Sequence, residues 1–284
     1  RKQLIAIDID TQAYHQLTDG TFNIVDFSVS PNGEDVVFLA VDVEHDTPLY
    51  NGTLYNLSLT DGTVTKLYDE SVASKPTYSP DGKWVAFIAG GLHERLYVIP
   101  STGGDAICLG SDYPDSLSDS IYTDMRYVSS SCKPQWSEDS QAIYVLSGHQ
   151  GSNEIVRFSM DQNESPVTVI GGPRAIFSFA YDGKTSIVTV YSSPTTPGKV
   201  SKMAINASEH VTRLKRLPTE DFSENNVYFP KEEVCIDDGN AECLSEINIV
   251  EPETFTYTSV DGWKMHGFLL KPANMKAGQT YPVV

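Results

Sequence analysis

A turn motif that recurs four times constrains the fold of this 284-residue chain more than any other feature. Each copy joins two short apolar runs through a turn of the Ser-Pro-Asp-Gly kind. The copies span residues 27–38, 76–87, 134–145 and 176–188. Pro fixes φ in such a turn, Asp or Asn accepts bonds from nearby amides, and Gly takes the left-handed conformation that closes a hairpin. Each copy therefore predicts a strand, a tight turn and a second strand.

The spacing of these turns indicates what the repeat builds. The residues at the Gly position of the turn are Gly33, Gly82, Ser140 and Gly183. Their intervals of 49, 58 and 43 residues match the span of propeller-blade repeats. A second pair of apolar runs usually follows, starting at 54–59, 96–99 and 155–160. Four strands per repeat predict an all-β fold, a β-propeller of four-stranded blades. The alternative is a β-sandwich, but a sandwich has no reason to repeat one turn in every four strands.

The repeat pattern also divides the chain. Residues 4–10 and 14–18 are typical of the last two strands of a blade whose first two are absent. Four blades follow and end near residue 205, and a degenerate blade runs from 211 to near 250. We therefore expect a partial propeller at 1–250, and a second, truncated domain that starts at 251–284.

Two stretches resemble a known family. The unit 79–87, together with 96–100 and Gly103-Gly104, resembles the blades of TolB-like propellers and of prolyl oligopeptidase family propellers. Residues 253–272 separate the two, because they resemble the start of the peptidase domain in the acylaminoacyl-peptidase and dipeptidyl peptidase V branch of the second family. In that segment an extended strand, an Asp261-Gly262 turn and a second strand lead to Lys271-Pro272.

The resemblance implies a function, and it implies that the catalytic centre lies outside this chain. It implies a serine exopeptidase of the dipeptidyl- or acylaminoacyl-peptidase type, whose propeller gates and orients short peptides and whose α/β-hydrolase domain begins at the end of this chain. No serine here has Gly both two before and two after it, as a nucleophile elbow requires. The catalytic triad is therefore expected beyond Val284, and this chain alone is expected to be inactive, without a cofactor. The alternative is a non-catalytic TolB-like propeller that serves as a protein-interaction platform.

Two places could hold the amino end of a substrate. Paired carboxylates suit an ammonium group, and Glu232-Glu233 is such a pair. The second place is an insert at 112–126, whose Asp124 and Arg126 are candidate substrate-binding residues. The structural alternatives are a solvated strand end for the pair and a solvent-facing loop for the insert. Five histidines are expected in loops or at blade edges, and His266 lies in the C-terminal strand pair.

Cysteines and sequons bear on compartment. Cys235 and Cys243 bracket a turn sequence that could join them in a disulfide across a hairpin, with two free thiols as the alternative. No cysteine pair has zinc-site spacing, so no metal is expected. Candidate glycosylation sites are Asn51, Asn56 and Asn206. Together these features favour a secreted or periplasmic protein over a cytoplasmic one.

Charge limits the partners. Acidic residues outnumber basic ones by 38 to 20, for a net charge of −18, which repels nucleic acid and anionic lipid surfaces. No apolar run is long enough to span a membrane. We interpret this charge as one that only keeps the protein soluble; the alternative is that it attracts cationic peptide amino groups. The expected partners are short peptide substrates and the chain's own C-terminal hydrolase domain. The oligomeric state is left open.

Overall fold

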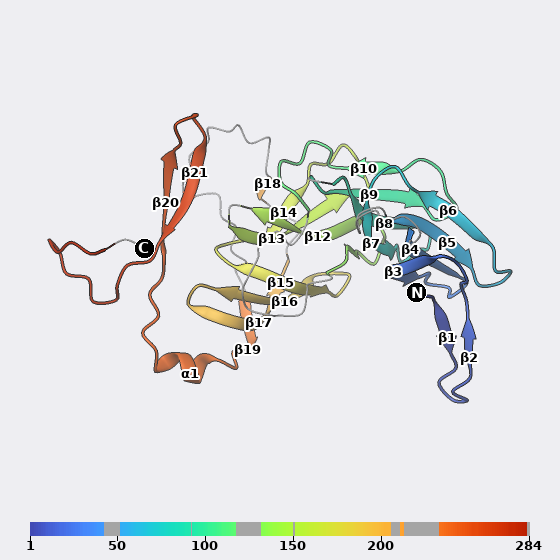
Figure 1. Cartoon of the computed structure of the whole chain (residues 1–284), viewed down its shortest axis with the longest axis horizontal. Coiled ribbons are helices and arrows are strands. Elements are labelled where there is room, and N and C mark those ends of the chain that lie inside the picture. The colour runs from blue at the N-terminus through green and yellow to red at the C-terminus, as the bar shows by residue number, and fades with distance from the viewer. Residues whose placement is uncertain are drawn as a thin grey trace.

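Four antiparallel sheets form the body of the protein in a computed structural model that describes residues 1–42, 52–91, 93–117, 132–149, 151–205, 211–212 and 233–282. Within these ranges the chain is nearly all β, with one short helix, α1 (Ala241–Ser245). The sheets lie side by side, a hairpin projects near the N-terminus, and another stands at the C-terminal end (Figure 1).

The strands follow chain order within each sheet. The first sheet holds β3 (Phe22–Val29), β4 (Asp35–Asp42), β5 (Thr53–Ser58) and β6 (Val64–Tyr68). The second holds β7 (Ala73–Tyr78), β8 (Trp84–Ala89), β9 (Arg95–Pro100) and β10 (Ile107–Leu109). The third holds β11 (Gln135–Trp136), β12 (Ala142–His149), β13 (Ser152–Ser159), β14 (Val167–Ile170) and β18 (Val211–Thr212). The fourth holds β15 (Ala175–Tyr181), β16 (Ser186–Ser193), β17 (Thr196–Ala204) and β19 (Glu233–Asp237). The two hairpins are β1 (Ile5–Ile7) with β2 (Tyr14–Gln16), and β20 (Glu253–Thr258) with β21 (Lys264–Leu269).

These sheets confirm the predicted blades. In each sheet the repeated turn joins the first two strands, and every later strand pairs antiparallel with the one before it in the sheet. A sandwich would stack two sheets face to face, whereas here four sheets follow one another. The fold class is therefore an all-β array of propeller blades.

The core lies between neighbouring sheets. Apolar side chains of the first and second sheets meet in one cluster that includes Leu54 and Phe87. A second cluster joins the second and third sheets, with Val98 and Phe158 among its members. A third joins the third and fourth sheets. The second and third sheets thus bury both faces against their neighbours, which explains why their strands are apolar on both sides.

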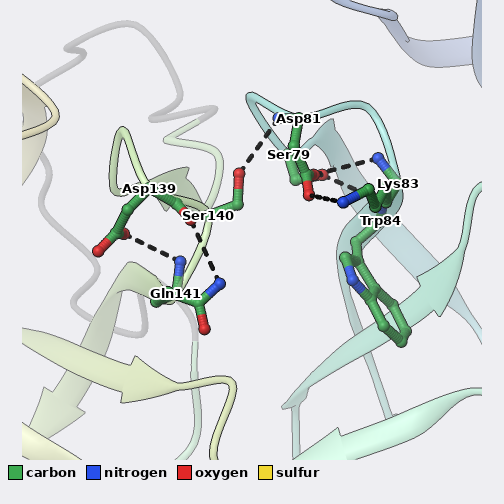
Figure 2. A network of polar contacts seen from close by, with 7 residues as sticks. All are labelled: Ser79, Asp81, Lys83, Trp84, Asp139, Ser140 and Gln141. Carbon is green, nitrogen blue, oxygen red and sulfur yellow. Dashed lines mark hydrogen bonds and ion pairs between the residues drawn. The ribbon is translucent and has the colours of Figure 1, made fainter.

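The turns have the predicted geometry. Gly33, Gly82 and Gly183 have φ of 74°, 73° and 83°, and Ser140 takes the same position with φ of 60°. In the second sheet the Ser79 hydroxyl donates to Asp81 at 2.6 Å and accepts from the Trp84 amide at 3.0 Å. Figure 2 shows this turn beside the turn of the third sheet, where the Ser140 hydroxyl accepts from the Asp81 amide at 3.2 Å.

Polar side chains also tie the blades to one another. The Gln135 side chain donates to the Phe179 carbonyl at 2.6 Å and accepts from the Tyr181 amide at 2.7 Å, so it takes the place of a strand partner between β11 and β15. Lys133, just before β11, reaches the first sheet and lies 2.6 Å from the Asp26 carboxylate. The first and third sheets are thereby linked as well.

Two expectations about residues 205–250 are wrong. The degenerate fifth blade does not form among the described residues, because β18 extends the third sheet and β19 completes the fourth. The fourth sheet has only three strands up to Ala204, so it requires an outer strand from further along the chain. The hairpin expected between Cys235 and Cys243 is instead strand β19, a turn and helix α1. Both cysteines are free and exposed, and no disulfide joins them.

The C-terminal hairpin has the predicted form. Strands β20 and β21 pair from Glu253 with Leu269 to Thr258 with Lys264. Gly262 has φ of 90°, and the Ser259 hydroxyl accepts from the Trp263 amide at 3.0 Å, as Ser79 does in the second sheet. The turn chemistry of the blades is therefore repeated here on a separate two-stranded sheet.

Candidate functional site

The most elaborate polar cluster among the described residues lies where the loop after β10 meets the β12–β13 turn. Tyr113 and Leu117 of that loop are buried in the core between the second and third sheets. The Tyr113 hydroxyl donates to Ser147 at 3.2 Å, and the Ser147 hydroxyl donates to the Ser116 carbonyl at 3.3 Å. In a propeller, the loop from one blade to the next and the turn between the second and third strands share a face, so this contact follows from the topology.

A histidine–carboxylate pair forms the centre of this cluster. His149 Nδ1 lies 3.0 Å from Asp115 Oδ2, and the His149 side chain is 9% exposed. The Arg95 guanidinium donates to the Asp115 carbonyl at 2.9 Å and so fixes the loop that carries the carboxylate. Glu154, on the neighbouring strand, is buried and accepts from the Thr168 hydroxyl at 3.1 Å. Such an arrangement holds one imidazole in a fixed orientation.

The C-terminal hairpin reaches the same place. The Gly151 backbone in the β12–β13 turn approaches β21 so closely that a Cβ there would lie 3.0 Å from Cζ of Phe268. His266 precedes Phe268 by two residues on the same strand. Burial lowers the pKa of His266 below its usual 6.5, and the charges of His149 and Lys264 lower it further. The third sheet and the hairpin therefore interact electrostatically as well as by contact.

A second polar cluster lies on the fourth sheet. Arg174 Nη1 is 3.2 Å from Glu233 Oε2, and its Cζ lies 4.5 Å from the centre of the Tyr191 ring. The Tyr191 hydroxyl donates to Glu233 Oε1 at 2.6 Å. Burial raises the pKa of the Glu233 carboxyl, but the Tyr191 hydrogen bond and the Arg174 charge outweigh burial, so the net shift is downward.

This geometry bears on the predicted role of Glu233. Its carboxylate is already neutralised by Arg174 and hydrogen-bonded by Tyr191. A substrate ammonium would have to displace the guanidinium to bind there. Its predicted partner Glu232 lies outside the described residues, as do the insert candidates Asp124 and Arg126. The described part of the insert, residues 112–117, contributes Asp115 instead.

Neither His149 nor Arg174 was predicted as a site residue. His149 was expected in a loop or at a blade edge and on the surface; the residue does end β12, but its side chain is buried against the insert. The available signal was that His149 precedes Gly151 by two residues. Gly151 marks the turn between the second and third strands of its blade, and that turn faces the loop from the preceding blade. Arg174 carried no sequence signal, because its partner lies 59 residues away.

The remaining predicted sites are placed as follows. Asn51 and Asn206 lie outside the described residues. Asn56 is described: its amide donates to Asp35 at 3.2 Å and its oxygen accepts from Tyr78 at 2.7 Å. A glycan on Asn56 would replace one of the two hydrogens of the Nδ2 atom that donates to Asp35. In the described part of the chain no group of three His, Cys, Asp or Glu could hold a metal ion, and no helix is long and apolar enough to cross a membrane.

Comparisons with known proteins identify similar sequences and similar folds. No protein-family model matches the sequence. The uncharacterized peptidase YuxL of Bacillus subtilis (strain 168) is 24% identical over 181 residues, which are 64% of this chain and 24% of the relative. A crystal structure of puromycin hydrolase matches with a TM-score of 0.55 at 18% identity, over 91% of this chain and 35% of the hydrolase. The acylaminoacyl peptidase of Pyrococcus horikoshii matches with a TM-score of 0.57 at 11% identity, over 99% of this chain and 48% of the peptidase.

The matches support a propeller fold that this chain shares with peptidases. At such identities the structural likeness concerns the fold, and this chain spans about a quarter of the length of its curated relative. A TolB from Acinetobacter baumannii also matches, with a TM-score of 0.52 at 20% identity, over 93% of this chain and 59% of TolB. The matched peptidases, TolB and this chain thus share the blade architecture described above, and a shared fold does not decide between functions.

Proposed function

We propose that this chain is the propeller of a serine exopeptidase of the dipeptidyl- or acylaminoacyl-peptidase type. In this proposal the propeller gates and orients short peptides, and the residues from 251 onward begin an α/β-hydrolase domain. The chemistry is acyl transfer by a Ser-His-Asp triad in that domain, which proceeds through an acyl-enzyme. The propeller supplies no catalytic residue.

The exposed apolar hairpin β20–β21 is the observation that carries this proposal. Large apolar side chains on it and beside it are open to solvent, including Trp263 at 66%, Phe268 at 58% and Leu270 at 68% exposed. A two-stranded hairpin is marginally stable in water unless a further layer covers it. An apolar patch of this kind marks a packing surface. We assign that surface to the hydrolase domain, in line with the resemblance of residues 253–272.

The net negative charge of the chain supports peptides as substrates. The net charge of −18 creates a field that attracts the ammonium group of a free peptide amino end. A peptide whose amino end is acylated lacks that charge. Free and acylated substrates should therefore differ in how strongly salt affects their capture, whichever of them the enzyme prefers.

The second candidate is a non-catalytic interaction platform. The TolB match favours this function, because TolB has the same blades at a similar TM-score. The platform function, however, assigns no partner to the apolar hairpin β20–β21. For that reason we favour the peptidase.

Peptide hydrolysis by the native protein tests the proposal. The protein would be isolated from its source with an antibody raised against residues 1–250, and then assayed with dipeptidyl and acylaminoacyl nitroanilides. We expect cleavage by the native protein and none by the 284-residue chain alone. If the native protein cleaves neither substrate class yet retains partner proteins, the platform is the correct reading and the peptidase is wrong.

A further inference from the structure

We propose that hairpin β20–β21 docks on the third sheet through a proton-sensitive contact, in which His266 faces the His149–Asp115 pair and Phe268 covers Gly151. This inference goes beyond the proposed function, because it concerns a contact within this chain and holds for either activity considered above.

The proposed contact consists of two residue pairs with the same spacing on both sides. His266 and Phe268 are two residues apart on β21, so both side chains leave the same face of the strand. His149 and Gly151 are likewise two residues apart, at the end of β12 and in the turn that follows. Phe268 meets Gly151, and His266 and His149 interact electrostatically. The two pairs therefore form one interface rather than two separate contacts.

The apolar point requires a glycine. Gly151 has φ of 79°, and a Cβ on it would lie 3.0 Å from Phe268 Cζ and 3.3 Å from Phe268 Cε2. A side chain at this position would be strained by its own backbone and would also push the ring away. The turn is thus shaped to receive the aromatic ring of Phe268.

The polar point brings positive charges together. Asp115 pairs with His149 at 3.0 Å. The charge of His149 also acts on His266, as does that of Lys264, which lies on the same strand face as His266. The charged and titratable groups on the elements that meet here are Asp115 on the loop after β10, Arg95 on β9, Glu154 on β13, and His266 and Lys264 on β21.

The direction of the pH effect follows from the docked state. Burial, and then His149 and Lys264, lower the pKa of His266 when the hairpin is docked. The docked state therefore favours neutral His266, so docking is strongest above the ordinary value of 6.5 and weakens as the pH falls below it. Because the His266 side chain is exposed, solvent screens these interactions and the change in the docking equilibrium is small.

Nuclear magnetic resonance of the full 284-residue chain tests this contact. With labelled His, Phe and Gly, the nuclear Overhauser effect between the Phe268 ring and the Gly151 α-protons reports docking, and the His266 ring protons report its titration. We expect the cross-peak at pH 7.5 and its weakening at pH 5. His149→Gln should reduce the loss of the cross-peak at pH 5 and move the His266 titration midpoint upward, while part of the pH dependence should remain because burial, the largest cause, is unchanged.

Two further variants keep the test decisive. Phe268→Ala, on the exposed hairpin, should remove docking and also move the His266 midpoint toward 6.5. His15→Gln, on the distant strand β2, is the matched control and should change nothing. If His149→Gln fails to fold by circular dichroism, Phe268→Ala decides alone. A cross-peak of equal strength at pH 5 and 7.5, or a His266 midpoint that Phe268→Ala does not move, would overturn the inference. Neither result depends on peptidase activity.

Discussion

At the scale of single residues, the repeated turn explains why this chain builds blades. A Ser hydroxyl, an Asp carboxylate and a residue in the left-handed conformation close each hairpin with short local bonds. Ser79, Asp81 and Gly82 do so in the second sheet, and Ser140 takes the Gly position in the third. The same residues also join neighbouring blades, because Ser140 accepts from the Asp81 amide.

Gly82→Ala should destabilise the protein by about 1 kcal/mol, because an L-residue is disfavoured in the left-handed conformation that Gly82 adopts. A Cβ there would meet only Pro31 at 3.7 Å, so the cost would come from the backbone and not from a clash. Urea unfolding measures the change. Gly239→Ala is the control, since Gly239 is not in that conformation and its surroundings are open. An equal loss in both variants would contradict this account of the turns.

The turn carboxylates predict an acid limit on stability. Hydrogen bonds from Ser137 and the Gln141 amide lower the pKa of Asp139, and the amides of Ser186 and Lys184 lower that of Asp182. Their stabilising effect is therefore present above the ordinary Asp value of 3.8 and is lost as the pH falls through the lowered values.

Thermal unfolding between pH 2 and 6 checks this limit. We expect the melting temperature to fall steeply below pH 4, and Asp139→Asn to make that fall shallower while lowering stability at neutral pH. Asp10→Asn, in the exposed N-terminal hairpin, serves as the control. A variant Asp139→Asn whose acid profile equals that of the parent chain would show that the turn carboxylates do not set the limit.

At the scale of elements, the sequence predicts strands and turns well and their long-range partners poorly. The Asp-Gly turns are local chemistry, so the hairpins of all four blades and of β20–β21 could be placed from sequence. The outer strand of the fourth sheet, β19, could not be placed in this way. It is separated from Ala204, the end of β17, by 28 residues in which the repeated turn does not recur. The His149–Asp115 pair was missed for the same reason, since 34 residues separate its members.

Gln135 gives a prediction about how elements join. Its side chain satisfies the Phe179 carbonyl and the Tyr181 amide between the third and fourth sheets. Gln135→Leu should leave both groups unpaired and cost about 2 kcal/mol. Gln141→Leu, in an exposed turn, is the matched control. Denaturant unfolding compares the two, and an equal effect would mean that Gln135 does not bridge the sheets.

At the scale of the whole molecule, the blades define a scaffold, and the hairpin β20–β21 is the feature on which we base our proposal of a peptidase over a platform. The blades are shared with TolB as well as with peptidases, so they cannot decide the function. The exposed apolar side chains of the hairpin, of which Phe268 approaches Gly151 of the third sheet, are what the peptidase proposal explains.

The net charge gives a prediction at this scale. Capture of a peptide with a free amino end should weaken as ionic strength rises, because salt screens the field of 38 acidic and 20 basic residues. The N-acetylated form of the same peptide should show a weaker dependence. Calorimetric titration of the native protein at low and high salt measures both affinities, and an equal salt dependence would mean that the field does not steer substrates.

Labelling of the native protein with a fluorophosphonate, followed by mass spectrometry of the labelled peptide, tests the central claim most directly. The peptidase account predicts one labelled serine, within a Gly-x-Ser-x-Gly sequence that matches no part of residues 1–284, and no labelling of the 284-residue chain alone. A native protein that takes up no label, or a label on a serine within these 284 residues, would contradict it.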